Sequence, residues 1–236
     1  MKTRSSGAIF TLLLPFLFSF TAPAAAYDVE GAVRLKPPFP SPVQIKVPQD
    51  QRETCGEYKL SPRLRLSPDG YVANAVIKIE GPFAEKSSAA QSQSFSIDQV
   101  NCEFVPHALL LPKGATLSVL NSEPILHNVR AFDEKAQMLF NDAMPVKGQV
   151  LKKEFKVPGK IPLRCGVHKW MHALIIVQEH PYYALSDENG KFKIQDIPDG
   201  NYTLTVWHEA LGEMRTTVSP HNAQVAVVYE SAPSAK

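Results

Sequence analysis

The chain has 236 residues, with 25 basic and 23 acidic side chains and a formal net charge of +2. This length suffices for one large all-β domain or two smaller ones. The balanced charge, without a run of basic residues, argues against nucleic acid as a partner.

The first 26 residues are typical of a secretory signal peptide. Lys2 and Arg4 form a basic start, residues 8–20 are almost wholly apolar, and residues 24–26 are alanines suited to cleavage. The apolar run is too short to span a bilayer as a helix, and no later segment is longer. We therefore expect a periplasmic or secreted protein without stable membrane insertion.

Three cysteines in an exported protein indicate one disulfide and one remaining thiol. Cys165 stands among other potential metal donors, whereas Cys55 and Cys102 have none nearby in the sequence. We therefore predict a Cys55–Cys102 disulfide and a free Cys165. The alternative, in which all three bind metal, is disfavoured because two of them lack neighbouring donors.

The N-terminal part of the mature chain, residues 27–97, is predicted to supply several β-strands. Prolines surround the short β-rich runs at 31–35 and 43–47, so these are predicted to be edge strands or irregular segments. Residues 71–80 alternate apolar and polar side chains, which predicts a strand. Residues 87–96, rich in Ser, Ala and Gln, are predicted to be a surface linker.

Residues 98–180 are predicted to form the β domain that carries the site. Residues 104–121 contain two β-rich runs around a turn and are predicted to form a hairpin-like pair. The runs at 151–157 and 161–164 are further strands. No segment has a sustained apolar period of 3.6 residues, so little helix is expected.

The last part, residues 181–236, alternates short strands with tight turns, as in a sandwich. Its motifs D-E-N-G-K-F, P-D-G and Y-T-L resemble the carboxypeptidase regulatory-like domain, a transthyretin-like β-sandwich. Only about fifty residues match, few for an independent sandwich. Two arrangements are open: a separate small domain, or a discontinuous sandwich completed by residues 31–35 and 71–80.

The stretch that carries chemistry is residues 161–177, which read as two strands around a short loop. The loop holds a thiol, two imidazoles and a thioether: Cys165, His168, Met171 and His172. Thiolate, imidazole and thioether form the ligand set that copper prefers. Cys165 and His168 would supply two strong ligands, and Met171 a weak axial one.

The third strong ligand must come from elsewhere, and His127 is the best candidate. It follows a predicted strand that ends at Asn121, so a sandwich could carry it beside the Cys165 loop. If His172 replaced Met171, the set would be one cysteine and three histidines, which suits structural zinc. We expect His172 instead to point to the opposite face of the following strand.

Two motifs resemble the cupredoxins, the small blue-copper proteins. C-G-V-H-K-W-M, which starts at Cys165, has the C-x2-H-x2-M spacing of amicyanin and pseudoamicyanin-like cupredoxins. Residues 104–121, followed by H-N-V, are similar to the cupredoxin strand pair that leads to the first ligand histidine. The resemblance implies a Greek-key β-sandwich with one type 1 copper bound by His127, Cys165, His168 and Met171.

The resemblance also implies that Asn128 braces the cysteine loop by hydrogen bonds. The resemblance also makes Trp170 and Val167 candidates for the surface on which a redox partner docks. The alternative is that Trp170 covers the metal site. His107 is interpreted as a surface residue, the alternative being a second, weak metal site. The remaining histidines lack donor clusters and are interpreted as solvated or structural: His180, His208 and His221.

These features predict an exported electron carrier whose copper cycles between Cu(I) and Cu(II), with a redox partner such as a cytochrome or dehydrogenase. The alternatives are copper storage or delivery, and a copper enzyme with an open coordination position. No arrangement typical of a hydrolase is present in the sequence, so no catalytic residue is predicted and we do not expect an enzyme. The overall layout resembles exported methylamine-utilisation-like proteins.

Overall fold

The computed structural model describes residues 25–83 and 94–232. Over these residues the regular secondary structure is almost entirely β-strand, and the helical segments are η1, Gln49–Gln51, and α1, Arg52–Cys55. The predicted all-β class and the scarcity of helix are confirmed. Most of the predicted signal peptide and most of the 87–96 linker lie outside the described residues.

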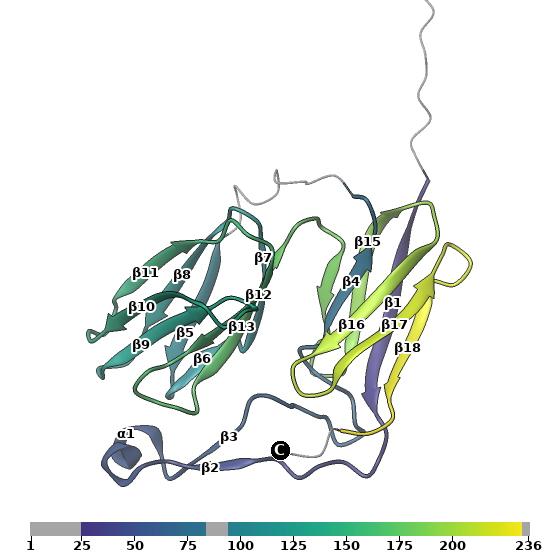
Figure 1. The fold of residues 1–236 in the computed structure, drawn as a ribbon. Coiled ribbons are helices and arrows are strands. Elements are labelled where there is room, and N and C mark those ends of the chain that lie inside the picture. Colours follow the sequence, from purple (N-terminus) through teal and green to yellow (C-terminus); the bar gives the residue numbers. More distant parts are fainter. Residues whose placement is uncertain (1–24, 84–93, 233–236) are drawn as a thin grey trace, which may run out of the picture.

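The middle of the chain forms a first sandwich of two sheets (Figure 1). The strand orders are β10-β9-β12-β13-β7 and β11-β8-β5-β6, and apolar side chains from both sheets fill the core between them. The bounds are β5 Phe95–Val100, β6 Glu103–Val105, β7 Ala108–Pro112, β8 Thr116–Asn121, β9 His127–Phe132, β10 Met138–Met144, β11 Val150–Glu154, β12 Gly159–Arg164 and β13 His172–Gln178.

The predicted hairpin within residues 104–121 is wrong. Strands β7 and β8 belong to different sheets, β7 running parallel to β13 and β8 parallel to β5. The chain therefore crosses from one sheet to the other at the turn between them. Because β7 and β8 lie in facing sheets, Leu111 of β7 and Leu117 of β8 both enter the core between the two sheets.

A second sandwich combines the two ends of the chain (Figure 1). Its sheets have the orders β14-β4-β16-β17 and β15-β1-β18. The bounds are β1 Ala26–Leu35, β4 Val76–Glu80, β14 Tyr183–Leu185, β15 Lys191–Pro198, β16 Tyr202–His208, β17 Gly212–Val218 and β18 Gln224–Tyr229. The first sandwich is thus inserted between β4 and β14. Of the two arrangements left open by the sequence, the structure has the discontinuous sandwich.

Strand β1 corrects another expectation. Residues 31–35 were predicted to be an edge or irregular segment because of nearby prolines. Instead β1 is the central strand of its sheet, antiparallel to β15 and parallel to β18. The prolines that follow begin at Pro37, beyond the end of β1, so every residue of the strand can donate to the ladder.

Between β1 and β4 the chain makes an excursion that reaches the first sandwich. Strands β2, Gln44–Lys46, and β3, Tyr58–Leu60, pair with each other, and η1 and α1 lie between them. Figure 1 shows this segment below the first sandwich. A disulfide joins Cys55 of α1 to Cys102, and Cys165 is free, as predicted. Val47 and Cys55 are buried in the core of the first sandwich.

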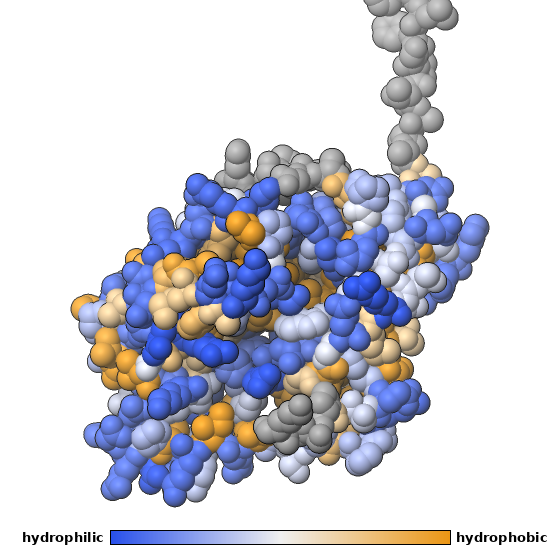
Figure 2. Space-filling model, in the orientation of Figure 1, coloured by the Kyte–Doolittle hydropathy of each residue, from blue (hydrophilic) through white to orange (hydrophobic). Residues whose placement is uncertain are grey.

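The two sandwiches pack against each other through a small apolar cluster. Val76 of β4 belongs to one cluster with Ala108 of β7 and with Leu174 and Ile176 of β13, and the partly buried Trp207 packs against this cluster. Over the face drawn in Figure 2, hydrophilic and hydrophobic side chains are interspersed. Among the described residues, no helix has the length and apolar character needed to cross a bilayer.

Candidate metal centre

Strand pairing brings His127 and Cys165 together. Strands β9 and β12 are antiparallel neighbours, with Arg164 opposite Arg130. In an antiparallel pair the start of one strand lies beside the end of the other. His127 begins β9 and Cys165 directly follows β12, so the two residues meet at the same end of the sheet.

Side-chain alternation directs both residues inward. Along β9, His127, Val129 and Ala131 are buried while the residues between them are half-buried. On β12, Leu163 is buried and Arg164 is exposed, so Cys165 continues the inward row. Because side chains of a strand alternate between faces, the sheet itself places a thiol and an imidazole in the core.

The loop between β12 and β13 adds the other donors. Its ends are joined by a hydrogen bond from the Cys165 N–H to the Met171 carbonyl (3.1 Å), and the Met171 N–H donates to the His168 carbonyl (2.9 Å). Gly166 is required here because a Cβ would collide with the side chains of Arg130 and Asn128. Asn128 Oδ1 accepts the Gly166 N–H (3.1 Å), which is the bracing bond that the family resemblance implied.

Three donor atoms converge in this core. Cys165, His127 and His168 each offer one ligand atom, and all three atoms lie within 4.8 Å of one another. The Nδ1 atoms of His127 and His168 are 3.1 Å apart, and His168 Nδ1 is 3.7 Å from Cys165 Sγ. The His168 N–H also donates to that sulfur, at 3.4 Å. One cysteine sulfur and two imidazoles therefore face a common point, as a trigonal copper site requires.

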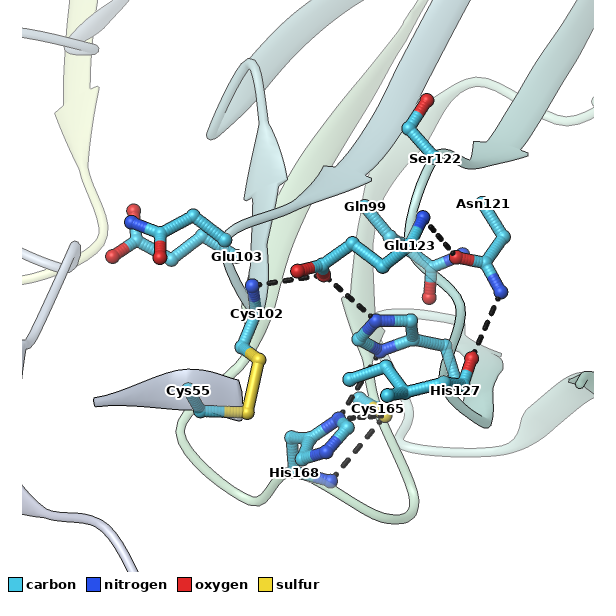
Figure 3. A network of polar contacts seen from close by, with 12 residues as sticks. Cys55, Gln99, Cys102, Glu103, Asn121, Ser122, Glu123, His127, Cys165 and His168 are labelled. Carbon is cyan, nitrogen blue, oxygen red and sulfur yellow. Dashed lines mark hydrogen bonds and ion pairs between the residues drawn. A yellow bond between two sulfur atoms is a disulfide. The ribbon is translucent and has the colours of Figure 1, made fainter. Parts of the chain in front are cut away.

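A carboxylate fixes the tautomer of His127 (Figure 3). Because a carboxylate only accepts, His127 Nε2–H must donate to Glu123 Oε2, at 2.9 Å. The lone pair of Nδ1 is then directed at His168. The same Glu123 oxygen accepts the Cys102 N–H, also at 2.9 Å. Asn121 holds the loop that presents Glu123, accepting its N–H and donating to the Met144 carbonyl.

Burial keeps both histidines uncharged. Desolvation lowers the pKa of His127, although Glu123 opposes this effect. Desolvation, followed by the proximity of His127, lowers the pKa of His168 to about 4. Neutral imidazole is the form that binds metal, so neither ring has to lose a positive charge before metal binds at neutral pH.

We expect Glu123→Ala to weaken copper binding because His127 would lose the partner that fixes its tautomer. Loss of such an outer partner typically costs about 10–100-fold in metal affinity. Competition with a copper chelator measures this change. Glu103→Ala is the matched control, since this nearby carboxylate pairs with Lys59 rather than with a ligand. Equal affinities in the two variants would contradict the role of Glu123.

Met171, the predicted axial ligand, is a buried residue of the same loop as Cys165 and His168. Its backbone is hydrogen-bonded to both. His172, the alternative ligand, is not in this cluster. It begins β13, and its ring belongs to a second group of side chains with His107 and Glu209.

Met171→Gln should leave copper bound but lower the reduction potential. A soft thioether favours Cu(I), whereas an amide oxygen favours Cu(II), and the axial ligand tunes the potential. Voltammetry of the copper-loaded variants measures the shift. Met214→Gln, on β17 of the second sandwich, is the control. An unchanged potential in Met171→Gln would remove the axial role from this residue.

Trp170 covers the candidate metal site. Trp170 is 5% exposed, and its Nε1–H donates to the Cys102 carbonyl at 3.0 Å. The Cys55 and Cys102 sulfur atoms lie within 4.8 Å of a His168 ring nitrogen, and because they are bonded to each other they are not thiolate ligands. Of the two roles considered for Trp170, the structure favours covering the site, while Val167 is half-buried.

The other histidines divide into three groups. The interpretation of His107 as a surface residue is wrong, because its side chain is buried where the two sandwiches meet. His180 and His208 are buried and therefore structural, whereas His221 is exposed. Sequence reasoning missed Glu123 and Glu209. The four-residue spacing of Glu123 and His127 was the available hint for the former, and no local pattern marks the latter.

Comparison with known proteins gives only distant likenesses. No protein-family model and no curated protein matches the chain. It is similar to a purple cupredoxin from Nitrosopumilus maritimus, with 22% identity over 36% of this chain and 100% of the other, at a TM-score of 0.33. It is also similar to a reduced amicyanin mutant, with 25% identity over 44% and 99%, at a TM-score of 0.34.

A third similar structure is the copper-containing nitrite reductase of Thermus scotoductus. The identity is 23%, over 42% of this chain and 25% of the reductase, at a TM-score of 0.32. Because all these TM-scores lie below 0.5, the likenesses do not decide what this chain does.

Proposed function

We propose that this protein is an exported type 1 copper protein that transfers electrons. The observation that carries the proposal is the convergence of Cys165 Sγ with the Nδ1 atoms of His127 and His168 in a buried core. Met171 on the same loop would complete the set as the weak axial ligand. One soft sulfur and two imidazoles, with a thioether, suit copper better than the hard cations.

The donor residues fit copper because of their chemistry and because the fold holds them in place. When bound, copper would supply a one-electron couple between Cu(I) and Cu(II). The sheet, the Glu123 carboxylate and the Asn128 amide hold the donors in place before metal arrives. Ligands held in one geometry need little rearrangement between two oxidation states, which favours transfer of electrons.

Burial of the ligands favours a carrier over the alternatives. Cys165, His127 and His168 are each at most 5% exposed. A copper enzyme needs an open coordination position for its substrate, and a delivery protein must release its metal readily. A site closed by Trp170 and held by hydrogen bonds from Glu123 and Asn128 is better suited to retaining copper while electrons pass. We therefore propose a carrier and not an enzyme.

The disulfide supports a location outside the cytoplasm. Disulfides such as Cys55–Cys102 persist in oxidising compartments and are rare in the cytosol. With the N-terminal signal-like sequence, this supports a periplasmic or secreted protein. We propose that its partner is a redox protein such as a cytochrome or a dehydrogenase.

Repeated redox cycling tests the proposed function. Copper-loaded protein is reduced with ascorbate and reoxidised with ferricyanide, while the thiolate-to-copper absorption band and the bound copper are followed. We expect the band to bleach and return over several cycles with copper retained. Release of copper on reduction would contradict the carrier and favour delivery, and a band that ascorbate does not bleach would contradict redox function.

A further inference from the structure

A second group of metal-binding side chains lies where the two sandwiches meet. His107 directly precedes β7 and His172 begins β13, both in the first sandwich. Glu209 lies in the turn between β16 and β17 of the second sandwich. One ligand atom of each residue lies within 4.8 Å of the other two. Residues separated by 102 positions, such as His107 and Glu209, are thus brought together by the packing of two domains.

Both imidazoles turn the same nitrogen toward the carboxylate. His107 Nε2 is 2.5 Å from Glu209 Oε1, and His172 Nε2 is 3.8 Å from Glu209 Oε2. The rings stand nearly perpendicular, with centroids 5.2 Å apart. Two nitrogens and two oxygens therefore surround one small volume at the domain boundary.

The opposite ring nitrogens are already occupied. His107 Nδ1 lies 3.2 Å from the His172 carbonyl, and His172 Nδ1 lies 3.2 Å from the Trp170 carbonyl. A carbonyl only accepts, so Nδ1 of His172 donates to the backbone, and Nε2 of a neutral His172 ring carries a lone pair. His107 Nε2 instead shares a hydrogen with the accepting Glu209 carboxylate, and a metal ion would take the place of that hydrogen. Imidazoles that bind metals are held in this way, with the second N–H bonded to a carbonyl or carboxylate.

The lone pair of His172 Nε2 faces no hydrogen-bond donor. Nε2 of His172 is buried and has no hydrogen-bond partner within the described part of the chain. Glu209 is joined by Arg63, whose Nε lies 3.3 Å from Oε2, but the Arg63 side chain is 59% exposed and can move away. A buried lone pair without a donor, beside a carboxylate and a second imidazole, is stabilised by a cation placed between the three groups.

We propose that His107, His172 and Glu209 bind a second divalent transition-metal ion, distinct from the copper at Cys165. Two histidines and one glutamate form a ligand set that holds zinc in proteins with a further position left for water or another ligand. The same set suits other divalent ions of the first transition row. Its ligands come from both sandwiches, so the ion would also fasten the two domains to each other.

The two proposed sites adjoin along the chain. Met171, the proposed axial ligand of the first, and His172, a ligand of the second, are consecutive. Because the strand alternates faces at this point, one side chain enters the core of the first sandwich and the next faces the second sandwich. The second site does not depend on copper occupying the first.

Zinc binding to the full chain tests this proposal. Equilibrium dialysis against Zn²⁺ is followed by metal analysis for the wild type, Glu209→Gln, Cys165→Ala and the double variant. We expect two ions per chain in the wild type, one in each single variant and none in the double variant. In the Cys165→Ala background, Glu209→Gln should raise the Kd for zinc by at least about tenfold, since loss of even an outer partner costs that much.

Glu213→Gln is the matched control, because it removes the same charge from the same hairpin in an exposed ion pair with Arg215. It should bind zinc as the wild type does. Thermal unfolding of each variant shows that the fold persists, and zinc should raise the unfolding temperature of Cys165→Ala but not of the double variant. Equal zinc binding by Glu209→Gln and wild type would overturn the proposal. The contact between His107 and Glu209 would then be an ion pair and not part of a metal site. If instead the Cys165 site does not bind metal, Cys165→Ala would bind the same number of zinc ions per chain as the wild type.

Discussion

Cys165→Ala is expected to abolish high-affinity copper binding and any thiolate-to-copper absorption. The sulfur is the softest of the three strong donors, and no other free thiol exists in the chain to replace it. The loss of affinity should exceed the roughly 10–100-fold that removal of an outer partner costs. Copper titration with absorption and metal analysis measures both effects.

Cys165→Ser serves as the isosteric comparison for this prediction. It preserves the volume of the side chain in a core where Cys165 is 5% exposed, so a lost band cannot be assigned to a cavity. The serine variant should stay folded, bind copper weakly and show no intense visible band. Retention of that band in either variant would end the type 1 assignment.

Removal of the disulfide is expected to destabilise the protein without removing its metal site. Cys55 and Cys102 are 47 residues apart in the sequence. Closing a loop of that length stabilises the folded state by about 4 kcal/mol through the entropy of the unfolded chain. Net stabilities of domains are only about 5–15 kcal/mol, so Cys55→Ala/Cys102→Ala should unfold at much lower urea concentration.

Both cysteines must be replaced together, because a lone Cys102 would leave a thiol beside His168. Copper affinity of the double variant should fall only modestly, since Glu123 and Trp170 bond to the backbone of residue 102 and not to its sulfur. Urea unfolding of the metal-free variant and wild type gives the stability difference. An unchanged midpoint, or complete loss of copper binding, would contradict this division of roles.

Local patterns predicted much of the fold and of the first site. The C-x2-H-x2-M spacing lies within one loop, so Cys165, His168 and Met171 could be grouped without knowing any long-range contact. His127 could be added only by assuming that it lies at a strand end beside the cysteine loop. The pairing of β9 with β12 confirms this position. The disulfide followed from the chemistry of the remaining cysteine.

The errors concern relations between distant strands. Whether β7 pairs with β8 or crosses to β13 depends on which sheet buries its apolar residues, and that is not encoded in the turn between them. His107 looked exposed because its burial comes from the second sandwich, and Glu209, which it contacts, is far along the chain. Glu123 was missed because its role depends on the path of the loop held by Asn121.

In the proposed function, His127, Cys165 and His168, with Met171, bind one copper ion through a thiolate. Stepwise addition of Cu(II) to the purified protein, followed by visible absorption, is the first measurement to make. An intense thiolate-to-copper band should grow linearly, saturate at one equivalent and bleach with ascorbate. Copper that binds without this band, or a cluster that takes zinc and rejects copper, would contradict the proposed function.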